Sequence, residues 1–207
     1  ATNTPAMPLS EAHFGGFLSE NTIVTIKIVC IMSTSTQTLE NNMTVSLSKR
    51  AMTYAYNKHL GHLRKYTHCE YLKHIAEVAQ IAGTVLDDEV HLAVAWLHDV
   101  VEDRGETYES LLVEFGEAVA EGVMLMSDME EGNRAQRKAQ ARDRLGASPG
   151  WIQTIKCADL ISNAPSIAQY DPRFFVTYKK EALLLLDVLD KADPAIREQA
   201  INIINRE

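Results

Sequence analysis

Four ionisable residues fall within six positions at the end of one apolar segment, VAWLHDVVED at residues 94–103. The first half of this segment is apolar on every side, as expected of a helix buried in a core. His98 and Glu102 are four positions apart, as are Asp99 and Asp103, so on one continuous helix the four side chains would share a broad face. Burying such a group is costly unless a cation, partners or water compensates its charges. A divalent metal bound by His98 and Asp99 would remove that cost and leave Glu102 and Asp103 beside it.

The residues of this segment alone leave a second interpretation open. A charged cluster at a helix C-terminus is often a solvated helix end, and a His-Asp dipeptide is a weak signal by itself. Two further positions favour a metal site. His74 lies upstream, and Asp159 lies downstream inside the apolar helical segment 155–163, where a charged residue needs a partner. The joint occurrence of these residues in this order carries the prediction.

The elements that must position these residues are predicted to be helices. Apolar residues recur at helical spacing from Tyr71 to Ala82, Asp87-Asp88 and Thr107 are suitable N-caps, and three prolines open later helices. The expected helices cover residues 71–82, 90–103, 107–115, 118–126, 134–145, 149–163 and 172–189, with a last one from Pro194. No convincing strand is expected after residue 45. We therefore expect an all-α fold, a single helical bundle of about eight to ten helices.

The N-terminal stretch differs from the rest of the chain. Residues 1–45 are rich in Thr, Ser and Asn, and only Thr22 to Cys30 has a texture that fits an isolated strand. We interpret them as an N-terminal extension, poorly structured or strand-like, such as a leader or a start placed too early. The predicted domain covers residues 46–207, and Met32 or Met43 would be an alternative start.

Bulk composition narrows the class of partner and the compartment. The 207 residues suit one domain, and a net charge of −8 argues against nucleic-acid binding by bulk electrostatics. A small anionic substrate remains compatible, since a bound cation and a few local basic residues override the global field. The apolar run from Ile23 to Met32 is too short to span a membrane. An odd number of cysteines without ligand-like spacing predicts reduced thiols and a cytoplasmic protein; the cysteines are Cys30, Cys69 and Cys157. The composition is compatible with a monomer or a homo-oligomer.

At this point the chain resembles a known family, the HD phosphohydrolases, whose pattern is His…HD…Asp. The segments HLRK, YLKH, LHDVVED, EFGEAVAEGV and SPGWIQTIKCADLISN are similar to the hydrolase domain of bifunctional alarmone synthetase/hydrolases. They are more similar still to the small alarmone hydrolases that include the metazoan SpoT homologues. The resemblance covers about residues 48 to 190, nearly all of the predicted helical part.

The resemblance implies a role for each matching residue and an activity. The implied metal ligands are His74, His98, Asp99 and Asp159, the residues that position and activate water are Glu102 and Asp103, and those that contact the nucleotide are Arg64, Lys65, Asn163 and Tyr178. Two imidazoles and two carboxylates are compatible with Mn²⁺, and Zn²⁺ is a chemical alternative. The implied reaction removes the 3′-pyrophosphate of guanosine tetra- or pentaphosphate, giving GDP or GTP and pyrophosphate.

Departures from the family pattern keep two other functions open. Ile75 stands where a proline usually follows the first metal histidine, and the loop at residues 66–70 lacks the common Gly and Pro. Because that loop borders the base pocket in the family, the substrate is alternatively another nucleotide, such as an adenine alarmone or a phosphorylated dinucleotide. A non-catalytic nucleotide-binding module is the remaining alternative, although every ligand is retained.

Two basic or histidine-rich groups are predicted to be structural. His59, His62 and His68 cluster near Arg64, with a spacing that fits a shared metal less well than the set around His98. The basic residues of the helix 134–145 fit a solvated face better than a substrate-binding face. These residues are Arg134, Arg137, Lys138 and Arg142.

Overall fold

The computed structural model describes residues 45–206, and this part of the chain contains ten α-helices and no strand. The helices are α2 (Leu47–Lys58), α3 (Leu72–Ala82), α4 (Glu89–Leu97), α5 (Val100–Arg104), α6 (Tyr108–Phe115), α7 (Glu117–Met126), α8 (Arg134–Ala147), α9 (Gly150–Tyr170), α10 (Pro172–Val188) and α11 (Pro194–Arg206). The all-α prediction is confirmed. The strand considered for Thr22 to Cys30 and the extension 1–45, except Val45, lie outside the described residues.

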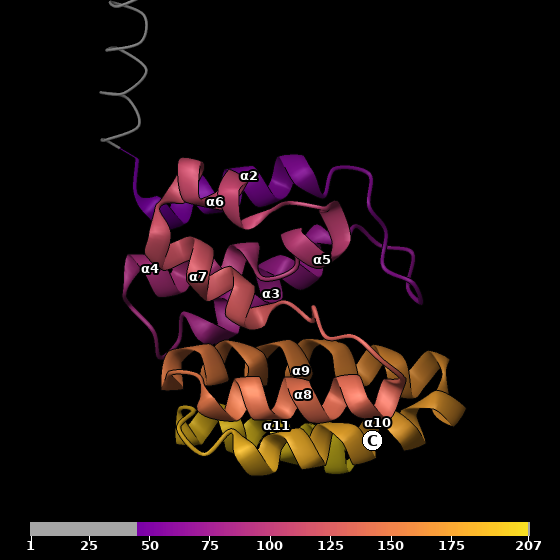
Figure 1. The fold of residues 1–207 in the computed structure, drawn as a ribbon. Coiled ribbons are helices and arrows are strands. Elements are labelled where there is room, and N and C mark those ends of the chain that lie inside the picture. Colours follow the sequence, from indigo (N-terminus) through magenta and orange to yellow (C-terminus); the bar gives the residue numbers. More distant parts are fainter. Residues whose placement is uncertain (1–44, 207) are drawn as a thin grey trace, which may run out of the picture. The chain divides into compact units, whose positions relative to one another are not determined.

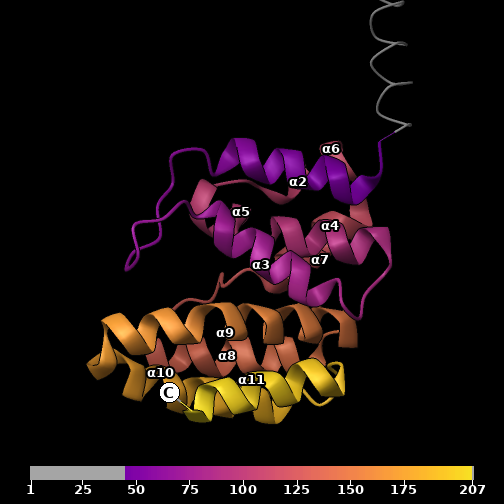
Figure 2. The same ribbon diagram turned by 180° about the vertical axis from the view of Figure 1, so that it is seen from behind.

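Within residues 45–206 the helices form two groups that meet along α9. Figure 1 shows α8 to α11 side by side in one group, with α2 to α7 in the other, and Figure 2 shows the same division from behind. Helix α3 packs against α4 and α9, so it lies between the segment that contains His98 and the helix that contains Asp159. The predicted site residues are thus carried by helices that contact one another.

Local capping explains where several helices begin. The Asp88 side chain accepts from the backbone N–H of Val90 at 2.8 Å at the start of α4. Thr107 and Asn133 form capping boxes at the starts of α6 and α8. Such caps satisfy backbone donors that have no partner inside the helix. The N-cap predictions for Asp88 and Thr107 are confirmed, and so are the proline starts of α10 and α11.

The single helix predicted over residues 90–103 is wrong, because the structure breaks it at His98-Asp99. Helix α4 ends at Leu97, and α5 begins at Val100. Asp99 adopts φ −106° and ψ 0°, outside the helical region, while the backbone N–H of Asp103 still bonds to the carbonyl of Asp99 at 2.9 Å. The His-Asp pair therefore lies at a turn between two short helices.

Two other helices extend beyond their predicted ends. Helix α9 continues past Asn163, through Pro165, to Tyr170, and α8 continues through Gly146 to Ala147. Proline inside a helix removes one backbone hydrogen bond and is unfavourable locally. Helix α9 packs against α3, α10 and α11, and these tertiary contacts outweigh the local preference.

Close packing fixes the distance between α4, α7 and α9. A Cβ atom at Gly122 of α7 would lie 2.6 Å from Val94 Cγ2 and 2.8 Å from a ring carbon of Trp151. Only glycine allows these helices to approach so closely. None of the helices within residues 45–206 combines the length and apolar character needed to cross a membrane.

Candidate functional site

Four side chains from three parts of the fold converge on one point. His74 projects from α3, His98 and Asp99 from the turn between α4 and α5, and Asp159 from α9. The Nε2 atom of His74 lies 3.4 Å from His98 Nε2, 3.3 Å from Asp99 Oδ2 and 3.4 Å from Asp159 Oδ1. His98 Nε2 lies 3.2 Å from Asp99 Oδ2 and 4.0 Å from Asp159 Oδ1. The structure thus brings together all four predicted ligands.

The chemistry and spacing of these donors fit a divalent metal ion. Imidazole and carboxylate ligands bind such ions at about 2.1 Å, so neighbouring ligands lie about 3 Å apart. The observed separations of 3.2–3.4 Å are close to that value. His74 and His98 are 2% and 1% exposed, so the site is closed to solvent on the histidine side. The residues present can therefore hold one divalent cation.

Each histidine is held by its second ring nitrogen. His98 Nδ1 lies 2.9 Å from the carbonyl oxygen of Ala95, to which it donates. His74 Nδ1 lies 2.8 Å from Ser162 Oγ, and Ser162 in turn donates to Glu77 Oε2 at 2.7 Å. Since the Ser162 proton is used on Glu77, the hydroxyl oxygen accepts from His74 Nδ1–H. Both Nε2 atoms therefore point toward the other ligands, and a cation would bind each of them in its deprotonated form, as is usual at metal sites.

The two carboxylate ligands are held in the same way. Asp99 Oδ2 accepts from the Tyr71 hydroxyl at 2.7 Å, and Asp159 accepts from Asn163 Nδ2 at 2.6 Å and from Lys156 Nζ at 2.9 Å. Burial opposes ionisation of Asp159, but Lys156 and the two histidines lower its pKa well below the ordinary value. Burial likewise disfavours charge on His98, yet Asp99 and Asp159 raise its pKa to about 9.

Glu102 and Asp103 lie beside this cluster, on α5. Burial of the carboxyl group is the main cause that raises the pKa of Glu102, partly opposed by Lys156 and by the backbone N–H of Asp128, which donates to Glu102 at 2.8 Å. Partial desolvation of the carboxyl group and the neighbouring Asp99 raise the pKa of Asp103. A carboxylate with a raised pKa is a better proton acceptor, and perturbed carboxyl groups of this kind gather at active sites.

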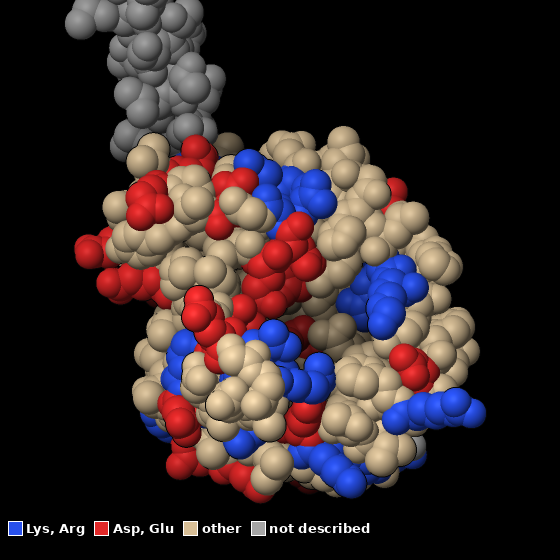
Figure 3. All heavy atoms as spheres, turned by 45° about the vertical axis from the view of Figure 1, so that its right-hand side comes forward, with Lys and Arg blue, Asp and Glu red and all other residues tan. Residues whose placement is uncertain are grey.

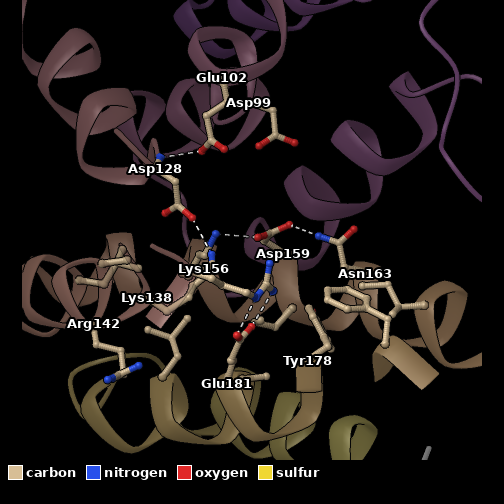
Figure 4. Close-up of a pocket in the computed structure, with 18 of the residues that line it drawn as sticks. Asp99, Glu102, Asp128, Lys138, Arg142, Lys156, Asp159, Asn163, Tyr178 and Glu181 are labelled. Atoms are coloured by element: carbon tan, nitrogen blue, oxygen red, sulfur yellow. Dashed lines mark hydrogen bonds and ion pairs between the residues drawn. The ribbon is translucent and has the colours of Figure 1, made fainter. Parts of the chain in front are cut away.

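A cavity of about 350 Å³ opens directly beside the four-residue cluster. Figure 3 shows a hollow in this face where acidic and basic side chains gather, and Figure 4 shows the residues that line it. Its charged and polar lining comprises Tyr71, Asp99, Glu102, Asp103, Asp128, Arg134, Lys138, Arg142, Lys156, Asp159, Asn163, Tyr178 and Glu181. Leu160, Ile167 and Phe174 are among its apolar residues. The volume lies in the range of small-molecule sites.

The predicted substrate residues separate into two pairs. Asn163 and Tyr178 line the cavity, whereas Arg64 and Lys65 do not. Arg64 donates to Asn163 Oδ1 at 3.1 Å and to the Ser166 hydroxyl, so it supports a lining residue from behind. Lys65 is exposed, and its amine lies 3.3 Å from the hydroxyl of its neighbour Tyr66.

Helix α8 contributes more to the cavity than its sequence suggested. Arg134, Lys138 and Arg142 line it, whereas Arg137 does not. Arg134 forms two hydrogen bonds of 2.7 Å with Glu181, and Lys138 pairs with Asp128 at 2.7 Å. Three of the four basic residues on the predicted solvated face therefore border the cavity, while the side chains of Arg134 and Lys138 remain 45% and 37% exposed.

Sequence reasoning assigned no role to Lys156 or Asp128. Lys156 Nζ contacts Asp159, and the charges of Asp128 and Glu102 also raise its pKa, although burial opposes this. Figure 4 shows Lys156 next to Asp159, with Asp128 nearby. The spacing of Lys156 and Asp159, three positions apart on a helix, was a local signal. For Asp128 no local signal exists, since its partners are distant in sequence.

Comparison with known proteins agrees with this geometry. Residues 51–148 match the model of the HD domain, a range that includes His74, His98 and Asp99 but not Asp159. The chain is 30% identical over 172 residues to a protein from Myxococcus xanthus named GTP pyrophosphokinase, covering 79% of this chain and 22% of that protein. It is 31% identical over 105 residues to the Danio rerio guanosine-3′,5′-bis(diphosphate) 3′-pyrophosphohydrolase MESH1, covering 49% of this chain and 58% of the relative. The Drosophila melanogaster protein of the same name is 30% identical over 115 residues, covering 54% and 64%.

Solved structures show the same fold. A metazoan orthologue of SpoT, described as hydrolysing ppGpp, superposes with a TM-score of 0.71 at 24% identity, covering 78% of this chain and 96% of that one. The chain spans about a fifth of the length of the first bacterial relatives and about 60% of the two MESH1 proteins. Together with the HD-domain match, these relatives confirm the resemblance predicted from the motifs. The described helices accordingly contain an HD domain, and the chain is similar in sequence to proteins named guanosine-3′,5′-bis(diphosphate) 3′-pyrophosphohydrolase.

Proposed function

We propose that this protein is a metal-dependent phosphohydrolase that removes the 3′-pyrophosphate from guanosine tetra- or pentaphosphate. The products are GDP or GTP and pyrophosphate. The observation that carries the proposal is the convergence of His74, His98, Asp99 and Asp159 at the wall of a charged cavity, with Glu102 and Asp103 beside them. The names of the MESH1 relatives support the choice of substrate.

We propose Mn²⁺ as the ion, held by His74, His98, Asp99 and Asp159. Two neutral imidazoles and two carboxylates suit a borderline divalent ion that keeps open positions for water. When bound, such an ion lowers the pKa of water and polarises a phosphoryl oxygen. The orienting bonds from Ala95, Ser162, Tyr71 and Lys156 prepare the ligands, so little rearrangement accompanies binding.

Glu102 is the residue best placed to take the proton from the attacking water. Burial raises the pKa of its carboxyl group above the ordinary glutamate value, while Lys156 and the Asp128 N–H keep the ionised form accessible. Asp103 lies on the same short helix and lines the same cavity. The reaction consumes one water, breaks the bond between the pyrophosphate and the 3′ oxygen, and leaves a proton on that oxygen. General-base assistance of this kind is worth about 10²–10⁴ in rate.

The cations of α8 and α9 complement an anionic substrate. Arg134, Lys138, Arg142 and Lys156 all line the cavity, and Figure 4 shows Lys138 and Arg142 on the side away from Asp99 and Glu102. Positive groups fixed in a cavity offset the charge that spreads over phosphoryl oxygens. Asn163 and Tyr178 add polar contacts to the lining. A polyphosphorylated nucleotide matches this distribution better than a neutral metabolite.

A second candidate is hydrolysis of another nucleotide by the same apparatus. It is favoured by the positions of Arg64 and Lys65, which the family resemblance assigned to the nucleotide and which do not line the cavity. An adenine alarmone or a phosphorylated dinucleotide would then be the substrate. We also propose a cytoplasmic protein that acts without nucleic acid or a membrane, as a monomer or a homo-oligomer.

The test is release of pyrophosphate from guanosine tetraphosphate in the presence of Mn²⁺, compared with EDTA and with Asp99→Ala. Rapid release that is lost in both comparisons is the expected result. Activity on the adenine compounds alone would favour the second candidate. If a folded protein that binds Mn²⁺ hydrolyses none of the nucleotides tested, the result would contradict catalysis and favour a nucleotide-binding module.

A further inference from the structure

A second cluster of metal-ligating side chains lies next to the first, formed by His59, His62 and Asp103. Each of the three residues offers one ligand atom, and these atoms all lie within 4.8 Å of one another. The two Nδ1 atoms of His59 and His62 are 3.2 Å apart. His59 follows the last turn of α2, whereas Asp103 belongs to α5, and α2 and α5 are in contact. The cluster is therefore made by tertiary packing and not by sequence proximity alone.

Tyr71 joins this cluster to the four-residue site. Its ring stacks on His62, with centroids 4.2 Å apart and planes inclined by 12°, and on His59 at 5.1 Å. Its hydroxyl donates to Asp99 Oδ2 at 2.7 Å. Both Tyr71 and Asp103 line the cavity, so the second cluster borders the same space as the first.

We propose that His59, His62 and Asp103 form a second divalent-cation site at the edge of the cavity. Two imidazoles and one carboxylate, with water completing the coordination, are the donor set that proteins use for Mn²⁺, Zn²⁺ and related borderline ions. The inference does not depend on the identity of the nucleotide, and it adds a ligand role for Asp103.

His59 is buried, and its ring nitrogens have few partners. His59 is 2% exposed, and its Nε2 atom has no hydrogen-bond partner among residues 45–206. The His59 atom that faces His62 is Nδ1, so Nδ1 is the atom that would bind a cation shared by the two rings. Burial lowers the pKa of His59 to about 4, so the imidazole is neutral and able to bind a metal at physiological pH.

A cation here would lie where an anionic substrate enters the acidic side of the cavity. Asp99, Glu102 and Asp103 give this wall a negative charge that opposes binding of phosphate groups. A second divalent ion would neutralise part of that charge, and pairs of cations commonly hold the oxygens of phosphoryl groups. The basic residues of α8 would then contact the phosphate groups from the opposite side of the cavity.

The test is a count of bound ions that requires no turnover. The metal-free protein is dialysed against Mn²⁺, and the metal per chain is measured by inductively coupled plasma mass spectrometry. We expect two Mn²⁺ for the wild type, one for His62→Asn and one for His98→Asn. The matched control is His68→Asn, which belongs to neither cluster, is exposed, and has a φ of 53° that asparagine tolerates; it should retain two.

Circular dichroism checks that each variant is folded. If His62→Asn fails to fold, Asp103→Asn replaces it, because Asp103 is exposed and its side chain is not needed in the core. One ion in the wild type, or two ions in both folded second-site variants, would overturn the proposal. A wild-type protein that binds two ions but releases no pyrophosphate would contradict the proposed function and leave the second site standing.

Discussion

His74 donates a hydrogen bond from Nδ1 to Ser162 Oγ over 2.8 Å, and this single contact fixes which nitrogen of the imidazole faces the carboxylates of the site. Ser162 is able to accept because its own proton is donated to Glu77 Oε2 at 2.7 Å. His74, Ser162 and Glu77, from α3 and α9, thus form a chain of two hydrogen bonds, here called the relay, that ends at the proposed metal ligand His74. The relay sets the tautomer of His74 before any ion arrives.

Removing the middle of this relay should weaken metal binding. In Ser162→Ala, His74 loses its acceptor and is free to rotate or change tautomer, so we expect Mn²⁺ affinity to fall by about 10–100-fold. Isothermal titration calorimetry with Mn²⁺ measures the change. The matched control is Ser166→Ala, on the same helix but without a contact to His74, which should bind Mn²⁺ normally. Equal affinity in Ser162→Ala and the wild type would refute the relay.

Glu102→Gln should separate catalysis from metal binding. The amide cannot accept the proton, so the rate should fall by about 10²–10⁴, while Mn²⁺ affinity stays near that of the wild type. Because burial raises the pKa of Glu102, the wild-type rate should decline on acidification through a pKa above the usual glutamate value. A pH–rate profile measures this limb. Glu117→Gln, at the exposed start of α7, serves as the control. Full activity in Glu102→Gln would exclude it as the base.

Replacing Lys156 should destabilise the fold. Lys156→Met leaves the carboxylates of Asp159, Asp128 and Glu102 without their shared cation, at a cost of about 3–5 kcal/mol at pH 7. The pKa of Asp159 is depressed in the folded state, so its contribution is present above the ordinary aspartate pKa and lost on acidification. The difference from wild type should therefore shrink at low pH.

Urea unfolding in EDTA, followed by circular dichroism at pH 7 and at lower pH, measures the effect of Lys156→Met. Lys156→Arg keeps the charge and should recover part of the stability. Lys180→Met, an exposed lysine of α10, is the control and should change little. A loss of the same size at every pH would point to packing in place of charge.

The two cysteines of the described residues should differ in reactivity. Burial raises the pKa of Cys157 to about 12, whereas Cys69 is half-buried. Only a thiolate reacts with iodoacetamide, so Cys69 should be labelled at pH 8 and Cys157 should not, until urea unfolds the protein. Peptide mass spectrometry distinguishes the sites. Since the thiolate of Cys157 forms only near pH 12, its protection should persist between pH 7 and 9, and labelling of native protein in that range would contradict the fold.

Elements governed by local chemistry were predictable from the sequence. Thr107, Pro172 and Pro194 mark the starts of α6, α10 and α11, because capping and the fixed φ of proline act within one turn. The break at Asp99 and the passage of α9 through Pro165 were not predictable in this way. They depend on packing between α3, α4 and α9, which overrides what neighbouring residues prefer.

The site residues also divide into those that the sequence predicts and those that only tertiary contacts reveal. His74, His98, Asp99 and Asp159 were predicted from their residue types and order, and the structure brings them together, although their binding of a metal stays a prediction. Ser162, Asp128 and Glu77 were missed, since the contacts that give them a role join residues 26 to 88 positions apart. No local sequence pattern indicates contacts between residues so far apart in the chain.

The contact between His74 and Ser162 spans 88 residues of chain, so the ligand set is complete only after α3 has packed on α9. An unfolded chain has no equivalent site, and an ion that binds the native state alone shifts the folding equilibrium by mass action. The barrier to unfolding should rise with it, because opening the α3–α9 contact must release the ion. Metal supply would then govern the lifetime of the folded protein as well as the proposed activity.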